Sequence, residues 1–486
     1  MAWGVRSSHL SAAFLLCVPT LLVLLATGCG NSTSTTVTGN TAVTVLASST
    51  ANDQLVQWNI TLTSLTLTNQ AGKTVTLFAT PQSVEYMHLN GRVEPRTTVS
   101  VPQDVYVSAS ATLSNQDEPV CVAVDTDTGG LYIDGAIGPL PASLSDVTVN
   151  LPAPITVNGT SMGLQLNLEV SKSISSVVCA PSAIGAASIT PTFNLTPVVI
   201  AAQPTNSTNG MATGLHGLIG SVNAGGSGFS VSGADGPTWQ VSIGGSTVFQ
   251  GITGVAQLAA GMPVDMDVAI QQDASLLATR VAVYDTNTAD LTVASGPLLS
   301  VSAAVPASYT AFSEQLGPLS NFIGPGMPLS YGNAVFQTSA QLTNLQSLPF
   351  TASFNATNMV AGQNVFASTH ALVISPEPIY VPATTLTLVP QTINGAVSAV
   401  SSSGGFTTYT ISLAPYDLFP NLAVQQGQTT LLNNPGSVVV YVDANTQLLN
   451  TESLAVGGVL RFSGLLFNDN GTLRMDCSQV NDGVAE

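Results

Sequence analysis

Charged side chains are the scarcest class of residue in this sequence. Asp, Glu, Lys and Arg make up 7% of its 486 residues, against about 25% in an ordinary soluble domain. Of these charges, 26 are acidic and 8 are basic. Nucleic-acid binding needs clustered Lys and Arg that replace condensed counterions, and docking on anionic lipid needs a polybasic segment. The composition therefore predicts no nucleic-acid partner and no electrostatic attachment to a membrane.

Aromatic residues and histidines are also few. Aromatic side chains account for 6% of the chain, which offers little ring surface for stacking on sugars. After residue 28 the histidines are His88, His216 and His370, which fall in three different predicted domains. No His-Glu-x-x-His motif occurs. We therefore predict no catalytic residue, no firm metal site and no cofactor.

Hydrophobic residues, in contrast, make up 45% of the sequence, enough for sizeable buried cores. Short alternating runs such as 58–62, 105–113 and 164–170 indicate half-buried strands. The sequence therefore predicts an all-β protein. We expect a β-sandwich-like N-terminal domain over residues 50–200 and a linker over 201–214.

Residues 1–28 have the pattern of an export signal. Arg6 lies in a short N-terminal region, and the apolar stretch at 12–26 is shorter than the about 20 residues of a spanning helix. The stretch is followed by Thr27, Gly28 and Cys29, and small residues before a cysteine resemble the bacterial lipobox, in which the thiol is acylated. We predict lipidation of Cys29, with an ordinary secretory signal as the alternative.

The residues after Cys29 are polar and rich in Gly, Ser and Thr, and we predict that residues 29–49 form a tether. About 20 such residues span roughly 25 Å as a flexible coil. The residue after the cysteine is Gly30 rather than Asp, which favours the outer membrane over the inner one. The predicted location is thus the cell envelope, with a lipid anchor.

Three cysteines remain in the body of the protein: Cys121, Cys179 and Cys477. In an oxidising compartment Cys121 and Cys179 can pair within the N-terminal domain. Closing that loop stabilises the domain by roughly 4 kcal/mol in the chain-entropy model. Cys477 is expected to be a buried strand residue.

Two sequence patterns recur three times in the same order after residue 214. The first, Gly-x-apolar-x-small-Val, begins at Gly217, Gly296 and Gly395. The second, Leu/Met-x-x-Gly-x-x-Val/Leu, has its glycine at Gly261, Gly362 and Gly457. We predict three tandem small β-barrel modules at 215–290 (module 1), 291–392 (module 2) and 393–486 (module 3). The glycine of the second pattern fits a turn that needs a positive φ.

These patterns carry a resemblance to known families. The repeat is similar to an uncharacterised small-barrel family common in bacterial envelope lipoproteins. The N-terminal domain resembles a second uncharacterised family of the same kind of protein, through Val101–Tyr106, Leu164–Val170 and the segment 194–199. Neither family has an established activity, so the resemblance implies location and architecture only.

Four polar features are candidate sites, each with a structural alternative. Asp125 and Asp127 alternate before two glycines and can wrap a Ca²⁺ ion, but a plain turn is favoured. Asp265 and Asp267 resemble a paired-carboxylate hydrolase site, although a solvated strand face is favoured. His216 is expected to be a hydrogen-bonded structural histidine, with a module interface as the alternative. Trp239 can line a sugar site, but a core position in a hairpin is favoured.

Three classes of function follow. The favoured one is a lipid-anchored, non-catalytic cell-envelope protein that acts as a structural or interaction scaffold, with other envelope proteins as partners. The second is a binding module for surface polysaccharide or peptidoglycan, marked by clustered Asn, Gln, Asp and aromatic side chains at the loop ends of a barrel. The third is a glycan hydrolase, which needs two carboxylates about 5–10 Å apart.

Overall fold

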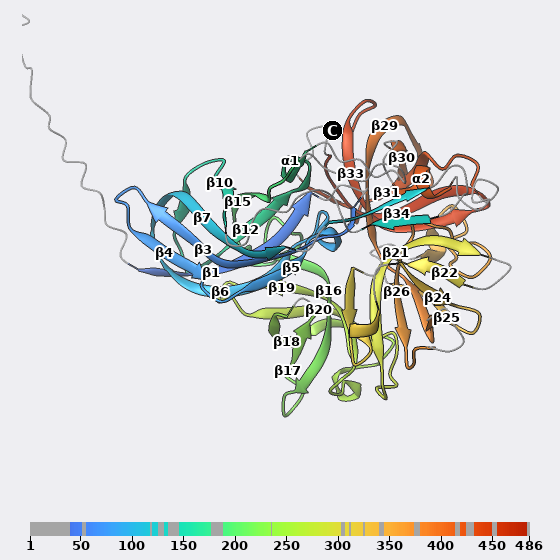
Figure 1. Ribbon diagram of the computed structural model, residues 1–486, viewed down its shortest axis with the longest axis horizontal. Coiled ribbons are helices and arrows are strands. Elements are labelled where there is room, and N and C mark those ends of the chain that lie inside the picture. The colour runs from blue at the N-terminus through green and yellow to red at the C-terminus, as the bar shows by residue number, and fades with distance from the viewer. Residues whose placement is uncertain are drawn as a thin grey trace, which may run out of the picture. The chain divides into compact units, whose positions relative to one another are not determined.

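The structure is a computed structural model, and it describes most of the chain beyond residue 38. The described ranges are 39–50, 55–116, 119–124, 131–134, 145–175, 188–234, 236–302, 307–310, 313–323, 326–339, 345–373, 380–413, 418–423, 432–449 and 454–483. The regular elements of these ranges are almost all strands (Figure 1), so the predicted all-β class is confirmed. No helix in these ranges is long and apolar enough to cross a membrane.

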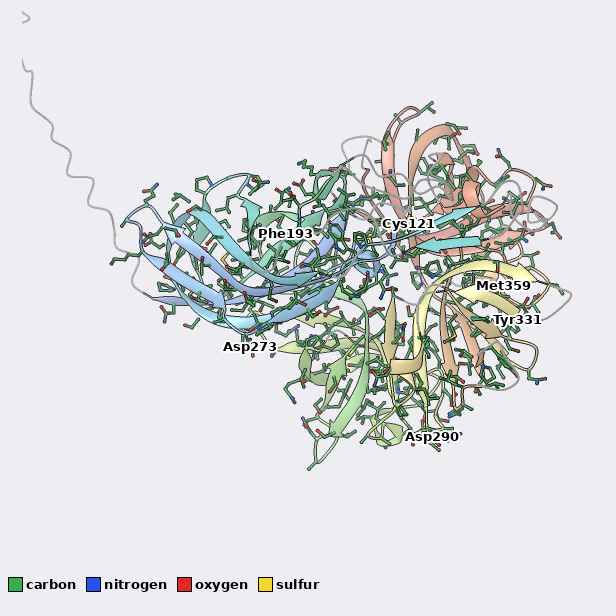
Figure 2. All side chains as sticks on the ribbon, in the orientation of Figure 1. Cys121, Phe193, Asp273, Asp290, Tyr331 and Met359 are labelled. Carbon is green, nitrogen blue, oxygen red and sulfur yellow. The ribbon has the colours of Figure 1, made fainter. Side chains whose placement is uncertain are left out.

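The first domain is built on one ten-stranded sheet. The main path is β4 (Thr74–Phe78), β3 (Asn59–Asn69), β7 (Asp104–Gln116), β10 (Ser145–Asn150), β15 (Thr192–Val198), β12 (Ser161–Glu169), β1 (Asn40–Thr50) and β6 (Glu94–Pro102). Off this path, β5 (Gln82–Glu85) pairs with β3, and β11 (Ile155–Val157) pairs with β7. The end strands β4 and β6 are in contact, so the sheet curls around a single core. Trp58 and Phe193 are fully buried in that core, and Figure 2 labels Phe193 among these strands.

The strand β1 differs from the tether predicted over residues 29–49. It begins at Asn40 and pairs in parallel with β12 and antiparallel with β6. Val43, Val45 and Ala47 are buried on one side of it. Leu46 is buried on the other side, in the apolar cluster of module 1, and residues 43–49 are buried throughout. The strand is therefore covered on both faces, and its Thr and Ser residues lie inside the protein.

Small elements complete the first domain. The turn η1 (Met87–Leu89) joins β5 to β6, and α1 (Val170–Ser173) follows β12. A two-stranded ladder pairs β13 (Ile174–Ser175) with β14 (Ser188–Ile189). A separate three-stranded sheet has the order β2 (Leu55–Gln57), β8 (Val120–Val124) and β9 (Leu131–Asp134).

Module 1 is a closed five-stranded barrel with the order β16-β17-β18-β20-β19. Its strands are β16 (Met211–Val222), β17 (Gly228–Gly233), β18 (Thr238–Gln250), β19 (Pro263–Ile270) and β20 (Leu276–Ala282), with the turn η2 (Val255–Gln257) before β19. All pairings are antiparallel except β18 with β20, which is parallel. Because β16 begins at Met211, the predicted linker over 201–214 extends into the first strand of the barrel.

Module 3 repeats this circuit. Its elements are β29 (Gln391–Ser403), β30 (Phe406–Leu413), α2 (Leu418–Ala423), β31 (Ser437–Val442), β32 (Gln447–Leu448), β33 (Val459–Asp469) and β34 (Thr472–Asp482). β31 pairs with β30 and, in parallel, with β34. Since β34 pairs with β33 and β33 with β29, these five strands form the same closed sequence of pairings as in module 1.

Module 2 has the same order with its third strand divided. Its strands are β21 (Thr292–Ser302), β22 (Ala307–Thr310), β23 (Glu314–Leu316), β24 (Met327–Ser330), β25 (Val335–Thr338), β26 (Asn364–Thr369), β27 (Val381–Pro382) and β28 (Thr385–Leu388); the turns are η3 (Ser320–Phe322) and η4 (Leu345–Ser347). β24 pairs with β22, while β25 pairs in parallel with β28. The two short strands together take the place that β18 has in module 1.

The two recurring patterns lie beside each other in every module. The glycine that begins the first pattern is opposite the last apolar residue of the second: Gly217 with Val264, Gly296 with Val365 and Gly395 with Leu460. The second-pattern glycine then donates its N–H to the first pattern: Gly261 to Ile219 O at 2.7 Å, Gly362 to Leu298 O at 2.7 Å and Gly457 to Val397 O at 2.8 Å.

The backbone explains both glycines. Gly261, Gly362 and Gly457 have φ of 83°, 94° and 91°, so the predicted positive φ is confirmed; other residues rarely adopt it. At Gly217 a Cβ would lie 2.3 Å from Val231 Cγ1 and 2.7 Å from Ser232 O. Both glycines therefore lie where the first strand of a module contacts its fourth, and the backbone at these positions requires a residue without a side chain.

The cores of these units are continuous with one another. Leu46 and Val93 of the first domain belong to the apolar cluster of module 1. Leu465 and Phe467 of module 3 belong to that of module 2, in which Figure 2 labels Tyr331 and Met359. Apolar contacts thus join successive units, and the charged residues described next lie where three of them meet.

Candidate functional site: a buried ionic cluster

Ten of the few charged and histidine residues gather at one place inside the protein, and we call them the ionic cluster. The members are Glu85, His88, Arg92, Glu94 and Arg96 of the first domain, His216, Asp265, Asp267 and Arg280 of module 1, and Glu314 of module 2. Five carboxylates, three guanidinium groups and two imidazoles therefore meet in a chain with very little charge.

The first-domain part is organised by Glu85, the last residue of β5. Its side chain is fully buried and accepts the backbone N–H groups of Trp58 at 2.8 Å, Met87 at 3.0 Å and His88 at 2.9 Å. These hydrogen bonds fold the chain into η1. They place the ring of His88 with Nδ1 3.1 Å from Glu85 and Nε2 3.3 Å from Glu94.

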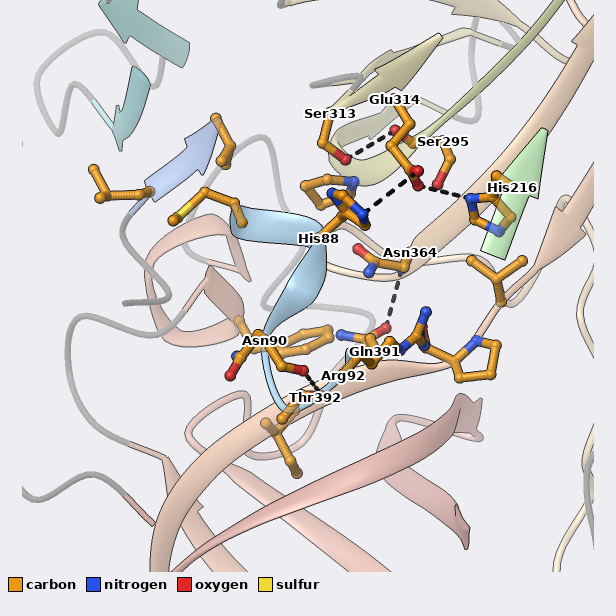
Figure 3. Close-up of a pocket in the computed structure, with 18 of the residues that line it drawn as sticks. His88, Asn90, Arg92, His216, Ser295, Ser313, Glu314, Asn364, Gln391 and Thr392 are labelled. Atoms are coloured by element: carbon orange, nitrogen blue, oxygen red, sulfur yellow. Dashed lines mark hydrogen bonds and ion pairs between the residues drawn. The ribbon is translucent and has the colours of Figure 1, made fainter. Parts of the chain in front are cut away.

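Glu314 joins the first domain to module 1 (Figure 3). It begins β23, and β23 pairs with β21 beside Ser295. Its Oε1 lies 3.6 Å from His88 Nε2, and its Oε2 lies 2.6 Å from His216 Nδ1. One carboxylate of module 2 therefore contacts an imidazole from each of two other units.

Arg280 neutralises the acidic pair on β19. Its guanidinium donates to Asp265 at 2.9 and 3.2 Å and to Asp267 at 2.8 and 3.0 Å. The strand register explains this geometry, because Asp267 is directly opposite Arg280 and Asp265 is opposite Ala282. The hydroxyl of Tyr284 lies 2.8 Å from Asp265 Oδ2 and completes the shell of that carboxylate.

The pKa shifts follow from burial and these partners. Burial by itself lowers the pKa of His216, but the Glu314 carboxylate, with Asp265, outweighs burial and raises it. Burial opposes ionisation of Glu314, yet His88 and His216 bring its pKa down to about 2. Arg280 and His216 likewise lower the pKa of Asp265 to about 2 in spite of burial.

The hydrogen bonds agree with a positive charge on both imidazoles. A neutral imidazole has one nitrogen that only accepts, and that nitrogen would face a carboxylate in either histidine. His88 faces Glu85 and Glu94, while His216 faces Glu314 at 2.6 Å and Asp265 at 3.8 Å. With both rings protonated, five positive groups balance five carboxylates, so the cluster is neutral as a whole.

The described residues also bring an aspartate of module 1 together with a serine and a histidine of module 2. Asp285 Oδ2 is 2.9 Å from Ser368 Oγ and 3.1 Å from His370 Nε2. A nucleophilic serine needs its hydroxyl on the imidazole, whereas here both Ser368 and His370 contact the carboxylate. Ser368 is also fully buried, so this trio has a structural geometry.

The structure shows where three sets of predicted site residues lie: the acidic pair of β19, His216 and Trp239. The favoured solvated face is wrong for Asp265, which is 1% exposed, because Arg280 supplies the partner that the sequence did not reveal. The side chain of Asp267 is 22% exposed. His216 is hydrogen-bonded to Glu314 of module 2. It is therefore both a hydrogen-bonded structural histidine and a residue at a module interface. Trp239 is buried, and its Nε1 donates to Pro95 O at 2.8 Å.

Other predicted site residues lie partly or wholly outside the described ranges. Cys29, Asp125, Asp127 and Cys179 are outside them, so lipidation and the calcium alternative stay predictions. Cys121 is buried in β8 and takes part in a disulfide; its pairing with Cys179 stays a prediction. Cys477 is a free thiol, and burial raises its pKa.

Sequence reasoning missed Glu85, Glu314 and Arg280. The available signal was their scarcity: in a chain with 7% charged residues, a charge within an alternating strand run is informative. Among the described residues no group of three or more His, Cys, Asp or Glu side chains is arranged to hold a metal ion. No protein-family model and no curated protein matches the chain.

Proposed function

We propose that this chain is a lipid-anchored, non-catalytic cell-envelope protein that acts as a structural or interaction scaffold. One observation carries the scaffold role: the segment Glu85–Arg96 of the first domain contacts all three modules. His88 faces Glu314 of module 2 at 3.6 Å, and Pro95 O accepts the indole N–H of Trp239 of module 1 at 2.8 Å. Gly91 O accepts the side-chain amide N–H of Gln479 of module 3 at 3.2 Å.

A scaffold needs domains that keep a fixed arrangement, and the buried ion pairs between the first domain and the modules favour a fixed arrangement. Breaking a buried ion pair by removing one partner costs about 3–5 kcal/mol, because the remaining charge cannot reach water. The shared apolar clusters add contacts between successive units. These contacts favour a rigid spacing between the β units, which suits a scaffold protein of the cell envelope.

The chemistry of the cluster supports a non-catalytic role. A general acid or base must exchange protons with a substrate near the working pH, and the pKa of Asp265 and that of Glu314 are both about 2. Asp265 and Asp267 are also bound by the same guanidinium. These carboxylates are therefore suited to holding charge partners in place.

The anchoring part of the proposal is tested by Cys29→Ser in the full chain, with Cys17→Ser as the matched control. We expect Cys29→Ser to abolish the mass of the lipid adduct and to move the protein from the membrane pellet to the soluble fraction. Cys17→Ser leaves both unchanged, because residue 17 belongs to the predicted signal. Membrane attachment and mass unchanged in Cys29→Ser would refute the lipid anchor.

The scaffold part is tested by cross-linking in intact cells followed by purification of the full chain. One envelope protein recovered in stoichiometric amount supports the scaffold. Retention of the Cys29→Ser protein on isolated wall or surface polysaccharide, without such a partner, replaces it by the second candidate.

That second candidate, a polysaccharide- or peptidoglycan-binding protein, is favoured by one polar groove of about 420 Å³. Its lining consists of Thr351, Ser353, Asn355, Thr357, Asn358, Asn433, Asn468, Asp469, Asn470 and Gly471. Amide and hydroxyl groups of this kind hydrogen-bond sugar hydroxyls. The lining has no aromatic ring, which is why the scaffold is placed first.

A further inference from the structure

Arg92 is the one guanidinium group of the ionic cluster that has no carboxylate partner among the described residues. Within the described part of the chain, its hydrogen bond runs from Nη2 to Pro390 O, at 2.7 Å. A guanidinium group has five N–H donors, so most of its donor capacity is unused. An unmade hydrogen bond of a charged group inside a protein is costly.

The backbone around Arg92 is shaped to hold it. Gly214 has φ of 68°, and a Cβ at that position would lie 2.6 Å from Arg92 Nη1. Any other residue would displace the guanidinium. Asp267 Oδ1 accepts the N–H of Gly214 at 2.9 Å, so the same acidic pair that binds Arg280 also fixes the turn under Arg92.

A cavity of about 380 Å³ lies against this guanidinium, and residues of the first domain and all three modules line it. Its charged lining consists of Arg92, His216, Asp265, Asp267 and Arg280. The two carboxylates are taken up by Arg280 through four hydrogen bonds. Arg92 is therefore the positive group of the lining that no carboxylate of the described residues hydrogen-bonds.

The remainder of the lining indicates the shape of a ligand. Met211, Val389 and Pro390 give the cavity an apolar wall, and Gln250 adds an amide. Pockets of roughly 300–1,000 Å³ with apolar walls and a few directed polar groups are typical of small-molecule sites. Arg prefers flat oxyanions that accept two parallel hydrogen bonds.

We propose that this cavity binds a small molecule through a terminal oxyanion, a carboxylate or a phosphate, that pairs with Arg92. The apolar wall accommodates the rest of the molecule. The site goes beyond the scaffold role, since it gives the junction of the units a ligand of its own.

The test is calorimetric titration of the purified full chain carrying Cys29→Ser with sodium benzoate and, separately, with inorganic phosphate at constant ionic strength. We expect saturable one-site binding of at least one probe. Benzoate alone identifies a carboxylate with an apolar body, and phosphate alone identifies a phosphate group. Absence of binding by both probes at 10 mM overturns the proposal.

Arg92→Gln keeps a donor for Pro390 O and removes the charge. We expect it to weaken binding at least tenfold, whereas Arg461→Gln, outside the cavity lining, leaves binding unchanged. Equal affinity in Arg92→Gln overturns the proposal. If Arg92→Gln does not fold, hydrogen exchange of the parent protein decides: benzoate or phosphate should protect residues 211–216 and 389–391, and protection only elsewhere refutes the site.

Discussion

The substitution Glu314→Gln tests the ionic cluster most directly. It keeps the shape of the side chain and removes the one carboxylate that contacts both His88 and His216. Removing one partner of a buried ion pair costs about 3–5 kcal/mol. The shift in the pKa of Glu314 from 4.5 to about 2 corresponds to about 3 kcal/mol of net stabilisation of the ionised carboxylate, with the opposing effect of burial included. Both routes therefore predict a loss of about 3 kcal/mol.

The pH dependence gives the same prediction a second signature. The pKa of His216 is raised in the folded protein, so its contribution is complete below its ordinary pKa of about 6.5 and is lost as the pH rises through the raised value. The pKa of Glu314 is lowered, so its contribution is complete above about 4.5 and is lost as the pH falls towards 2. The cluster is then most stabilising at about pH 4.5–6.5, and Glu314→Gln flattens both sides of this profile.

The assay is urea unfolding followed by tryptophan fluorescence. Trp58 and Trp239 are the only tryptophans after residue 28. Both report on the junction, because the backbone N–H of Trp58 donates to Glu85 and the indole N–H of Trp239 donates to Pro95 O. The matched control is Glu169→Gln, whose partner Lys172 is 63% exposed; an exposed pair contributes about 0–1 kcal/mol. A Glu314→Gln protein with the urea midpoint and pH profile of the parent would refute our account of the cluster.

Two further predictions concern the modules and the cysteines. Gly457→Ala should lower the stability of module 3 by about 1–2 kcal/mol, because Gly457 has φ of 91° and an alanine there is strained. Gly245→Ala, at a glycine with open space and no positive φ, is the control in thermal unfolding, and equal melting of the two variants contradicts the turn argument. Alkylation of the native protein without reductant, followed by peptide mass mapping, should leave Cys121 and Cys179 unmodified, while reductant exposes both. Modification of both cysteines before reduction would exclude their disulfide.

Local sequence determined much of the fold of this protein. Alternating apolar residues predicted the all-β class, since a strand has one buried and one polar face. The second-pattern glycines predicted positive φ, and Gly261, Gly362 and Gly457 have it. Both inferences succeed because they depend on neighbouring residues and on the steric freedom of the backbone alone.

The boundaries of the first domain show where local composition is insufficient. The predicted tether includes residues 40–49, although five of these ten residues are Ala, Val or Leu, and they form most of β1, between β12 and β6. The partner strand β12 is more than 110 residues away in the sequence. Residues 43–49 are buried between these neighbouring strands, and the local sequence does not identify the neighbours.

The ionic cluster was decided by tertiary structure alone. His88 and Glu314 are separated by 226 positions, and His216 and Glu314 by 98. Each residue in isolation is an unremarked charge or histidine in a strand or turn. These residues become partners only when the first domain, module 1 and module 2 pack together. A charge buried between them needs a partner of opposite charge. The sequence supplied the residues and their scarcity, and only the fold supplied the distances.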